Sequence, residues 1–325
     1  MAKVLVMGAS GFLGSHVVKE LCAAGRTVRI MVRASSDIRT TDHLPLERVI
    51  GDLGDSESIA AAMAGCEAVY YCIVDTRAWL RDPAPLYATN VDGLRRVLDI
   101  ALRFPLQKFV FTSTFATIGL NASGVSTEAD AFNWRSRAPH YVKCRVEAEE
   151  MFFRYCRDKG LPGVACCVAN TYGADDVAPT PHGKMVQDVA LGKMPYYWDG
   201  GGPCVGIRDA ARALLLAETR GRTGQRYILA ERWLDYEELF AIAASAAGVA
   251  PPGTKIPLPV LYAMAGIADL RSIFTRKDNR LSVASLRCST LLPNVDCAKA
   301  RQELGWQPAP VEKEVAEAVA YYLSG

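Results

Sequence analysis

Three glycines at regular spacing near the N-terminus carry the clearest chemistry in this 325-residue sequence. The stretch 8-GASGFLG-14 follows an apolar run, 3-KVLVM-7, and opens a stretch of helical periodicity at 12–24. In a strand–turn–helix unit of this kind, one glycine permits a tight turn, a second lets a pyrophosphate approach the backbone, and a third lets the helix pack on the strand. The free N–H groups at the start of the helix also favour an anion. We therefore predict a dinucleotide-binding turn made by Gly8, Ser10, Gly11, Phe12, Leu13 and Gly14.

An arginine follows the second predicted strand, at 27–32. An acidic residue at this strand end would bind the ribose 2′-hydroxyl of NAD, whereas an arginine suits a 2′-phosphate through charge-assisted hydrogen bonds. Arg33 has this place, and Ser36 can add a hydroxyl donor. The plain alternative for Arg33 is a solvated surface side chain. We predict NADP(H) as the cofactor, with NAD(H) as the alternative.

The elements that must position these residues alternate along the first 170 residues. Strands that alternate with helices predict βαβ units and a parallel sheet, and strands that are apolar throughout are covered by helices on both faces. We therefore predict an α/β fold, a Rossmann-type doubly wound parallel sheet. The apolar, strand-like runs are 3–7, 27–32, 47–52, 67–74, 107–114 and 163–169.

Glycine and proline become more frequent after residue 170, as in 178-APTPHG-183 and 250-APPG-253, while helical stretches continue. This pattern predicts a smaller α-rich C-terminal substrate lobe with long connections. We expect residues 1–170 to form the dinucleotide-binding domain, joined by about 204–232. Residues 171–203 and 233–325 would form the interleaved substrate-binding lobe.

Composition limits the class of protein. The chain has 37 Lys and Arg against 35 Asp and Glu, a net charge of +2, which argues against nucleic-acid binding. No apolar run approaches the ~18 residues that a membrane span needs, and the N-terminus lacks the features of a secretory signal. Ten cysteines without a CxxC pair, with only four histidines, predict reduced buried thiols and no metal site. We expect a cytoplasmic enzyme or binding protein with a small-molecule ligand.

Further short stretches resemble the extended short-chain dehydrogenase/reductase family, and the resemblance covers nearly the whole chain. They are 51-GDL-53, 90-NVDG-93, 112-TST-114, Tyr141 with 147-EAE-149, and 170-NTYG-173. The closer likeness is to the dihydroflavonol-reductase and 3β-hydroxysteroid-dehydrogenase branch. Three stretches are similar to hopanoid-associated sugar-epimerase-like proteins: 114-TFATIGL-120, 177-VAPTPHGKM-185 and 224-GQRYILA-230.

The resemblance implies further cofactor contacts. Asp52 would bind the adenine amino group, and Leu53 would pack on the base, although both also suit a plain strand-end turn. Asn90 would support the catalytic region, or would simply bridge the backbone. Ile73 and Val74 would lie beside the cofactor, where this branch usually has two small alanines.

The family's chemistry implies a tyrosine that transfers a proton, here Tyr141, and a hydroxyl that orients the substrate oxygen, here Thr114. Thr112 would lie against the cofactor. The family places a lysine four residues after the tyrosine, on the same helix face, where its charge lowers the tyrosine pKa and its amine holds the nicotinamide ribose. Arg145 stands at this position, while Lys143 would face away. Arginine keeps the positive charge but cannot relay a proton, so the resemblance implies an atypical site.

Two features bear on the substrate. Asn170 matches a position that contacts substrate phosphates in nucleotide-sugar members and lines the pocket in others, so we expect Thr114 and Asn170 to face the substrate. The stretch 256-IPLPVLYAMAGIADL-270 is apolar at helical spacing. Core packing is its plain interpretation, and a hydrophobic wall for a bulky apolar substrate is the alternative.

The leading hypothesis is an NADP(H)-dependent oxidoreductase that acts on a ketone or secondary alcohol. Its substrate would be mid-sized and largely apolar, such as a terpenoid, steroid, flavonoid-like or polyketide compound. One alternative is a nucleotide-sugar epimerase or dehydratase, and another is a catalytically weak dinucleotide-binding protein. The resemblance also implies a homodimer formed through the helices at about 85–103 and 140–159.

Overall fold

Seven parallel strands form the central sheet of the computed structural model, which describes residues 3–324. Their order in space is β11-β7-β5-β4-β1-β2-β3, so the winding reverses between β1 and β4. At such a switch point the carboxyl ends of the strands border a crevice. The predicted Rossmann-type fold class is confirmed. The strands are β1 (Lys3–Met7), β2 (Thr27–Val32), β3 (Glu47–Ile50), β4 (Ala68–Tyr71), β5 (Lys108–Thr114), β7 (Gly163–Val168) and β11 (Arg226–Leu229).

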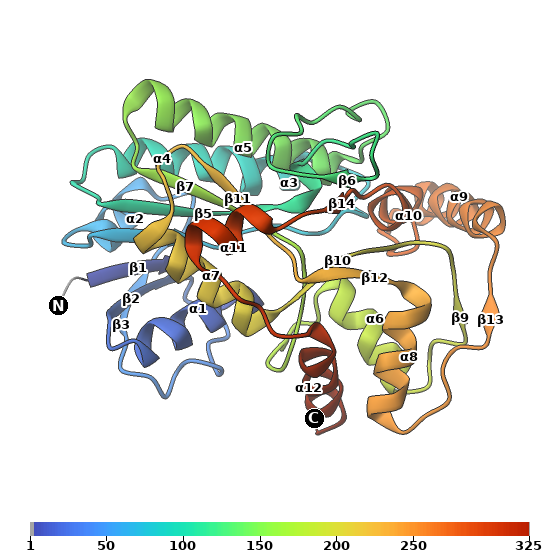
Figure 1. Cartoon of the computed structure of the whole chain (residues 1–325). Coiled ribbons are helices and arrows are strands. Elements are labelled where there is room, and N and C mark those ends of the chain that lie inside the picture. Colours follow the sequence, from blue (N-terminus) through green and yellow to red (C-terminus); the bar gives the residue numbers. More distant parts are fainter. Residues whose placement is uncertain (1–2, 325) are drawn as a thin grey trace.

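Helices cover both faces of this sheet (Figure 1). In β1, Val4 and Val6 pack toward one group of helices, and Leu5 and Met7 pack toward the other. Successive side chains of a strand point to opposite faces, which is why these strands are apolar at every position. The first group is α1 (Phe12–Ala23), α7 (Ile207–Arg220) and α11 (Ala298–Leu304), and the second is α2 (Ser56–Met63), α4 (Leu94–Ala101) and α5 (His140–Lys159). A short helix, α3 (Ala84–Tyr87), and a π-helical turn, η1 (Ala88–Gly93), lead into α4.

A second, smaller part of the chain is built on a three-stranded sheet of order β12-β10-β8. Its strands are β8 (Asn170–Tyr172), β10 (Gly201–Gly206) and β12 (Arg232–Asp235). Most of the helical residues in its core come from α6 (Pro181–Ala190), α8 (Tyr236–Ala247) and α12 (Val311–Ser324). Beside them lie β9 (Tyr196–Tyr197), β13 (Thr254–Lys255), α9 (Leu258–Thr275) and α10 (Val283–Thr290).

The chain returns to the large sheet after α10. Strand β14 (Asn294–Val295) pairs with β6 (Val125–Ser126), and α11 then packs on α7 and β11. The expected division into 1–170 with 204–232, and 171–203 with 233–325, stays a prediction. Helix α11 lies within the segment 233–325, yet its buried residues pack in the core of the large sheet.

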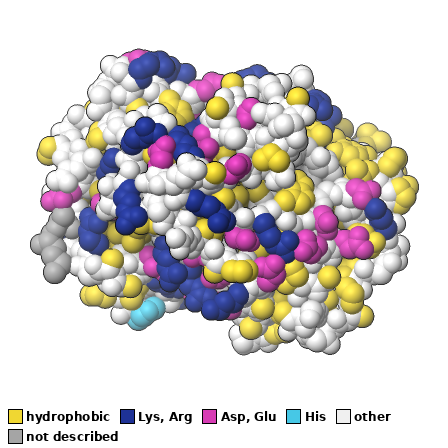
Figure 2. Space-filling view, in the orientation of Figure 1, with side chains coloured by type: hydrophobic (Ala, Val, Ile, Leu, Met, Phe, Trp, Pro, Cys, Tyr) yellow, Lys and Arg dark blue, Asp and Glu magenta, His cyan; other side chains and the backbone are white. Residues whose placement is uncertain are grey.

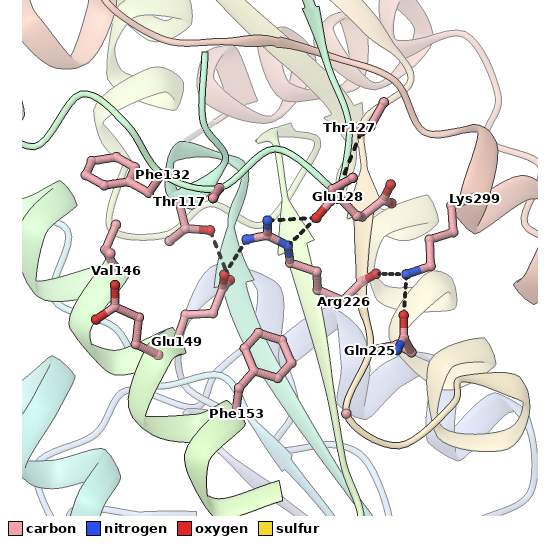
Figure 3. Close-up of a pocket in the computed structure, with 14 residues that line it drawn as sticks. Thr117, Thr127, Glu128, Phe132, Val146, Glu149, Phe153, Gln225, Arg226 and Lys299 are labelled. Atoms are coloured by element: carbon pink, nitrogen blue, oxygen red, sulfur yellow. Dashed lines mark hydrogen bonds and ion pairs between the residues drawn. The ribbon is translucent and has the colours of Figure 1, made fainter. Parts of the chain in front are cut away.

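A buried charged network holds α5 against the sheet (Figure 3). The carboxylate of Glu149, which is 4% exposed, accepts hydrogen bonds from Arg226 Nη1 at 2.8 Å and Thr117 Oγ1 at 2.9 Å. It also accepts from Ser113 Oγ and from Cys167 Sγ. These partners lie in β5, β7, β11 and the short helix η2 (Phe115–Thr117), so one side chain ties α5 to three strands.

Replacing Glu149 by glutamine removes the only salt-bridge partner of the mostly buried Arg226 guanidinium within residues 3–324. We expect a loss of about 3 kcal/mol in the free energy of unfolding, because breaking a buried ion pair leaves an uncompensated charge. Glu150→Gln is the matched control, since Glu150 forms an exposed pair with Arg135, and its effect should stay within about 0.5 kcal/mol. Denaturant unfolding measures both, and equal losses would contradict the structural role of Glu149.

Candidate functional site

The glycine turn between β1 and α1 has the geometry of a phosphate cradle. Gly8 has a φ of +87°, and a Cβ there would lie 2.7–2.9 Å from the backbone of Cys72 and Ile73. A Cβ on Gly14 would lie 2.1 Å from the carbonyl oxygen of Gly8. Gly11 precedes α1, no side chain caps this helix, and its first turn has no acidic residue. The amides at the start of α1 are therefore available to an anion.

The turn after β2 carries the predicted NADP(H) residues. Arg33 is exposed, its amide donates to Ser36 Oγ at 3.1 Å, and its guanidinium has no ion pair among residues 3–324. The nearby carboxylate of Asp37 is already paired with Arg39 at 2.6 Å. The strand end therefore presents an uncompensated positive charge.

Asp52 and Leu53 follow β3 on the same edge of the sheet. Asp52 is exposed, and its Oδ1 accepts from the amide of Gly54 at 2.8 Å, which is the geometry of a turn. Leu53 is half-buried beside η1, where a Cβ on Gly93 would lie 2.8 Å from its Cδ1. The strand-end turn that was the alternative interpretation of Asp52 and Leu53 is therefore present. Their contacts with adenine stay a prediction.

Asn90, in η1, joins the loop after β4 to α5. Its side chain is fully buried, accepts from the Asp75 amide at 2.9 Å, and donates to the Asp75 carbonyl at 2.9 Å. It also donates to Cys144 Sγ at 3.4 Å. Ile73, half-buried, and Val74, which is 39% exposed, begin this loop. Asn90 thus bridges the backbone and, by the same contacts, fixes the loop relative to α5.

Arg145 is buried, and no carboxylate among residues 3–324 pairs with it. The side chain is 1% exposed, Nη2 donates to the carbonyl oxygen of Thr112, and the guanidinium carbon lies 5.3 Å from the centre of the Phe111 ring. Nε and Nη1 of Arg145 have no hydrogen-bond partner within the described part of the chain. The buried hydroxyl of Tyr71 also has none there. Buried donors of this kind are rare in proteins, and they call for a ligand or water that accepts from them.

Tyr141 lies one turn before Arg145, at the start of α5, and is half-buried. Burial raises the pKa of Tyr141 to about 12, while the charge of Arg145 acts in the opposite direction. Weaker contributions that also raise this pKa come from Cys288 of α10, Cys144 and Asp75. Tyr141 is therefore protonated at neutral pH.

Thr114, predicted to orient the substrate, ends β5 and is 9% exposed. Its Oγ1 accepts from the Ala116 amide at 3.3 Å, which leaves the hydroxyl hydrogen free to donate elsewhere. No hydrogen bond joins Thr114 to Tyr141 among residues 3–324. Asn170 lies in the second sheet, where a Cβ on Gly202 would come within 2.6 Å of its Nδ2. Asn170 likewise has no hydrogen bond to Tyr141 within these residues.

Sequence reasoning missed two neighbours of Tyr141. Asp75 could have been found as the acidic residue just after a buried strand, but Cys288 comes from a distant helix and leaves no local signal. None of the predicted catalytic or cofactor residues lines the cavity of about 600 Å³ beside Glu149 and Arg226 (Figure 3). That cavity lies on another side of α5 from the Tyr141 site.

Comparisons with known proteins agree with this geometry. A family model described as the NAD dependent epimerase/dehydratase family matches residues 4–230. The sterol demethylase protein B of Methylococcus capsulatus is 29% identical over 98% of this chain and 97% of its own length. A putative dihydroflavonol 4-reductase of Synechocystis sp. is 28% identical over 98% of this chain and 93% of its own length.

Among solved structures, the crystal structure of gox2253 is similar with a TM-score of 0.88 and 30% identity, over 100% of this chain and 98% of that one. The family resemblance stated from the sequence is confirmed, and with it the expectation of an oxidoreductase that uses a nicotinamide dinucleotide. The chain belongs to the NAD dependent epimerase/dehydratase family of extended short-chain dehydrogenases and reductases.

Proposed function

We propose that this protein is an NADP(H)-dependent oxidoreductase that interconverts a ketone and a secondary alcohol on a mid-sized, largely apolar substrate. The observation that carries the proposal is a protonated Tyr141 one helical turn from the buried guanidinium of Arg145. The two side chains would act as proton donor or acceptor and as electrostatic support.

The cofactor would be held by the turn from Gly8 to Gly14, by Arg33 and Ser36, and by Asp52. The available amides of α1 suit the pyrophosphate. The uncompensated guanidinium of Arg33 favours a 2′-phosphate, because an arginine can bind it with charge-assisted hydrogen bonds. A bound nicotinamide supplies or accepts the hydride of this chemistry.

Arg145 would take the lysine's place at the nicotinamide ribose. Its Nε and Nη1, and the hydroxyl of Tyr71, are among the buried polar groups that have no partner within residues 3–324, so a ribose hydroxyl that accepts from them would relieve their burial. The same charge stabilises a phenolate at Tyr141. Arg145 cannot release a proton itself, so the proton would pass between Tyr141 and solvent by another route.

Proton transfer at Tyr141 fits reduction of a ketone at neutral pH. With its pKa near 12, the hydroxyl is protonated and can donate to the developing alkoxide. Oxidation of the alcohol needs the phenolate, so this direction should become faster as the pH rises. Thr114, whose hydroxyl hydrogen is free, would orient the substrate oxygen.

The apolar character of the substrate is supported by the groups around Tyr141. One cluster packs Tyr141 with Trp134 and Val142, and with Cys288 and Leu292 from the region of α10. The names of the two relatives, sterol demethylase protein B and putative dihydroflavonol 4-reductase, also support an apolar substrate.

A nucleotide-sugar epimerase or dehydratase is the second candidate. Asn170 favours it, because its buried side chain makes no hydrogen bond among residues 3–324 and could receive a phosphate or sugar hydroxyl. Such an enzyme would retain NAD(H) and consume none. Two incubations separate the candidates. An oxidoreductase consumes NADPH in the presence of a ketone, whereas an epimerase or dehydratase converts a nucleotide sugar without net consumption of cofactor.

Tyr141→Phe tests the proposed function. We expect kcat/KM for NADPH-dependent ketone reduction to fall about 10²–10⁴-fold, the usual contribution of a general acid, while NADPH affinity stays near that of the wild type. The wild-type rate should be constant between about pH 6 and 9, because Tyr141 stays protonated there. Tyr155→Phe is the control, since Tyr155 lies on the same helix and bonds Asp99 instead. Full activity of Tyr141→Phe would refute the assignment.

Arg33→Asp tests the cofactor preference. We expect NADPH to bind about 10–100-fold more weakly, since the variant loses a charge-assisted hydrogen bond to the 2′-phosphate and gains a repulsive charge. NADH binding should improve, because a carboxylate can accept from the free 2′-hydroxyl. Fluorescence titration with both cofactors measures this, and Arg103→Asp, another exposed arginine, controls for net charge. An unchanged preference would show that Arg33 is a solvated surface residue.

A further inference from the structure

Helix α9 presents an apolar face that no other part of residues 3–324 covers. Figure 2 shows hydrophobic side chains gathered at the end of the molecule where α9 lies. Five large side chains, spaced three or four residues apart, are 41–80% exposed: Val260, Met264, Ile267, Leu270 and Phe274. The core packing expected for 256–270 is therefore wrong for most of this helix. Only Leu261 and Ala265 of this stretch are buried.

Helix α9 is as apolar as a membrane-spanning segment, but it lies on the surface of the protein. Its 18 residues have a mean hydropathy of 1.2, and by length and composition α9 could cross a membrane. Its other side packs on α10, and Asp269 accepts from the Val283 amide at 3.0 Å, which binds it to the lobe. A surface helix that is held to the protein on one side and exposes an apolar face on the other can lie in the plane of a bilayer surface with that face in the lipid.

Positive charge is concentrated beside this face. The segment from α9 to α10 has five basic residues against two acidic ones, in a chain whose total charge is only +2. None of the five has an ion pair within residues 3–324: Arg271, Arg276, Lys277, Arg280 and Arg287. Uncompensated cations next to an apolar face complement an anionic lipid surface.

A hollow of about 290 Å³ lies at the C-terminal end of α9. Two cations and two hydroxyls line it, from Arg271, Lys277, Ser272 and Thr275. Asp278 also lines it, but its Oδ1 already accepts from the amide of Arg81 at 3.1 Å. The chemistry of this lining suits the phosphate of a lipid headgroup.

The same segment borders the Tyr141 site. Arg280 places its guanidinium 5.3 Å from the ring of Trp79, in the loop that follows β4. Cys288 of α10 packs in the cluster that includes Tyr141. The segment from α9 to α10 thus carries the apolar face and the cations and also contacts the surroundings of Tyr141.

We propose that α9 docks this protein on an anionic phospholipid bilayer, with its apolar face in the lipid and the cations at its C-terminal end on the headgroups. The docking is independent of the reaction. Its consequence, that an apolar substrate reaches Tyr141 from the membrane, rests on the proposed function.

Sedimentation with phosphatidylcholine vesicles, with and without phosphatidylserine, tests the docking. The wild type should pellet with the anionic vesicles, and high salt should release it. Leu270→Glu should lower the partition coefficient about tenfold or more, because a buried leucine is lost from the lipid. Leu323→Glu, at a similarly exposed leucine on α12, should bind like the wild type.

Replacing both Arg271 and Lys277 by glutamine should weaken binding to anionic vesicles about 25-fold, from roughly fivefold for each cation near the surface. The matched control changes Arg137 and Lys193 to glutamine, two exposed cations elsewhere on the molecule. Circular dichroism establishes that each variant is folded.

Three results would overturn the proposal: a wild type that stays in the supernatant with anionic vesicles, a Leu270→Glu variant that pellets like the wild type, or a wild-type dimer that Leu270→Glu dissociates. The last would make a second copy the occupant of the α9 face. Vesicle binding without any ketone reduction would leave the docking intact and refute only the proposed function.

Discussion

The burial of the Arg145 guanidinium is the constraint on which the geometry of the site depends. A charge that is 1% exposed and has no carboxylate partner within residues 3–324 costs free energy to keep in the fold. It stays in place because α5 is fixed on either side of Arg145. Asn90 holds Cys144 near the start of the helix, and Glu149, held by Arg226, anchors the helix one turn beyond Arg145. Loosening either contact would let the charge move toward water.

Two opposing effects of this environment set the proton chemistry at Tyr141. Burial disfavours the phenolate of Tyr141, while the Arg145 charge favours it. The pKa of Tyr141 is about 12, which shows that burial has the larger effect. Burial also raises the pKa of the Tyr71 hydroxyl and of the Cys144 thiol, and the Arg145 charge opposes this effect at both groups. In the proposed reaction, Tyr141 would hold its proton until a substrate oxygen draws it away, as the reduction of a ketone requires.

The sequence predicted local features well and long-range ones poorly. The predicted helix at 140–159 has these bounds in α5, and the glycine spacing predicted a turn in which a Cβ on Gly14 would collide with Gly8. Periodicity could not tell that Arg145 is buried, because the fold around a helix decides which polar residue it covers. Nor could it show that the apolar residues of α9 face outward, since a core helix and a lipid-facing helix share one pattern. The contact of Cys288 with the Tyr141 cluster and the return of α11 to the large sheet depend on tertiary packing alone.

If the Arg145 guanidinium serves a bound cofactor, it should do so at some cost to the stability of the free protein. Denaturant unfolding of the wild type and of Arg145→Met, with and without NADPH, measures both effects. Without NADPH the variant should be as stable as the wild type or up to about 2 kcal/mol more stable, because an apolar side chain of similar length replaces an unpaired buried charge. NADPH should raise the free energy of unfolding of the variant by at least about 1.4 kcal/mol less than it raises that of the wild type, which corresponds to tenfold weaker binding. A variant that is strongly destabilised alone, yet gains as much from NADPH as the wild type, would contradict this role and make Arg145 a structural residue.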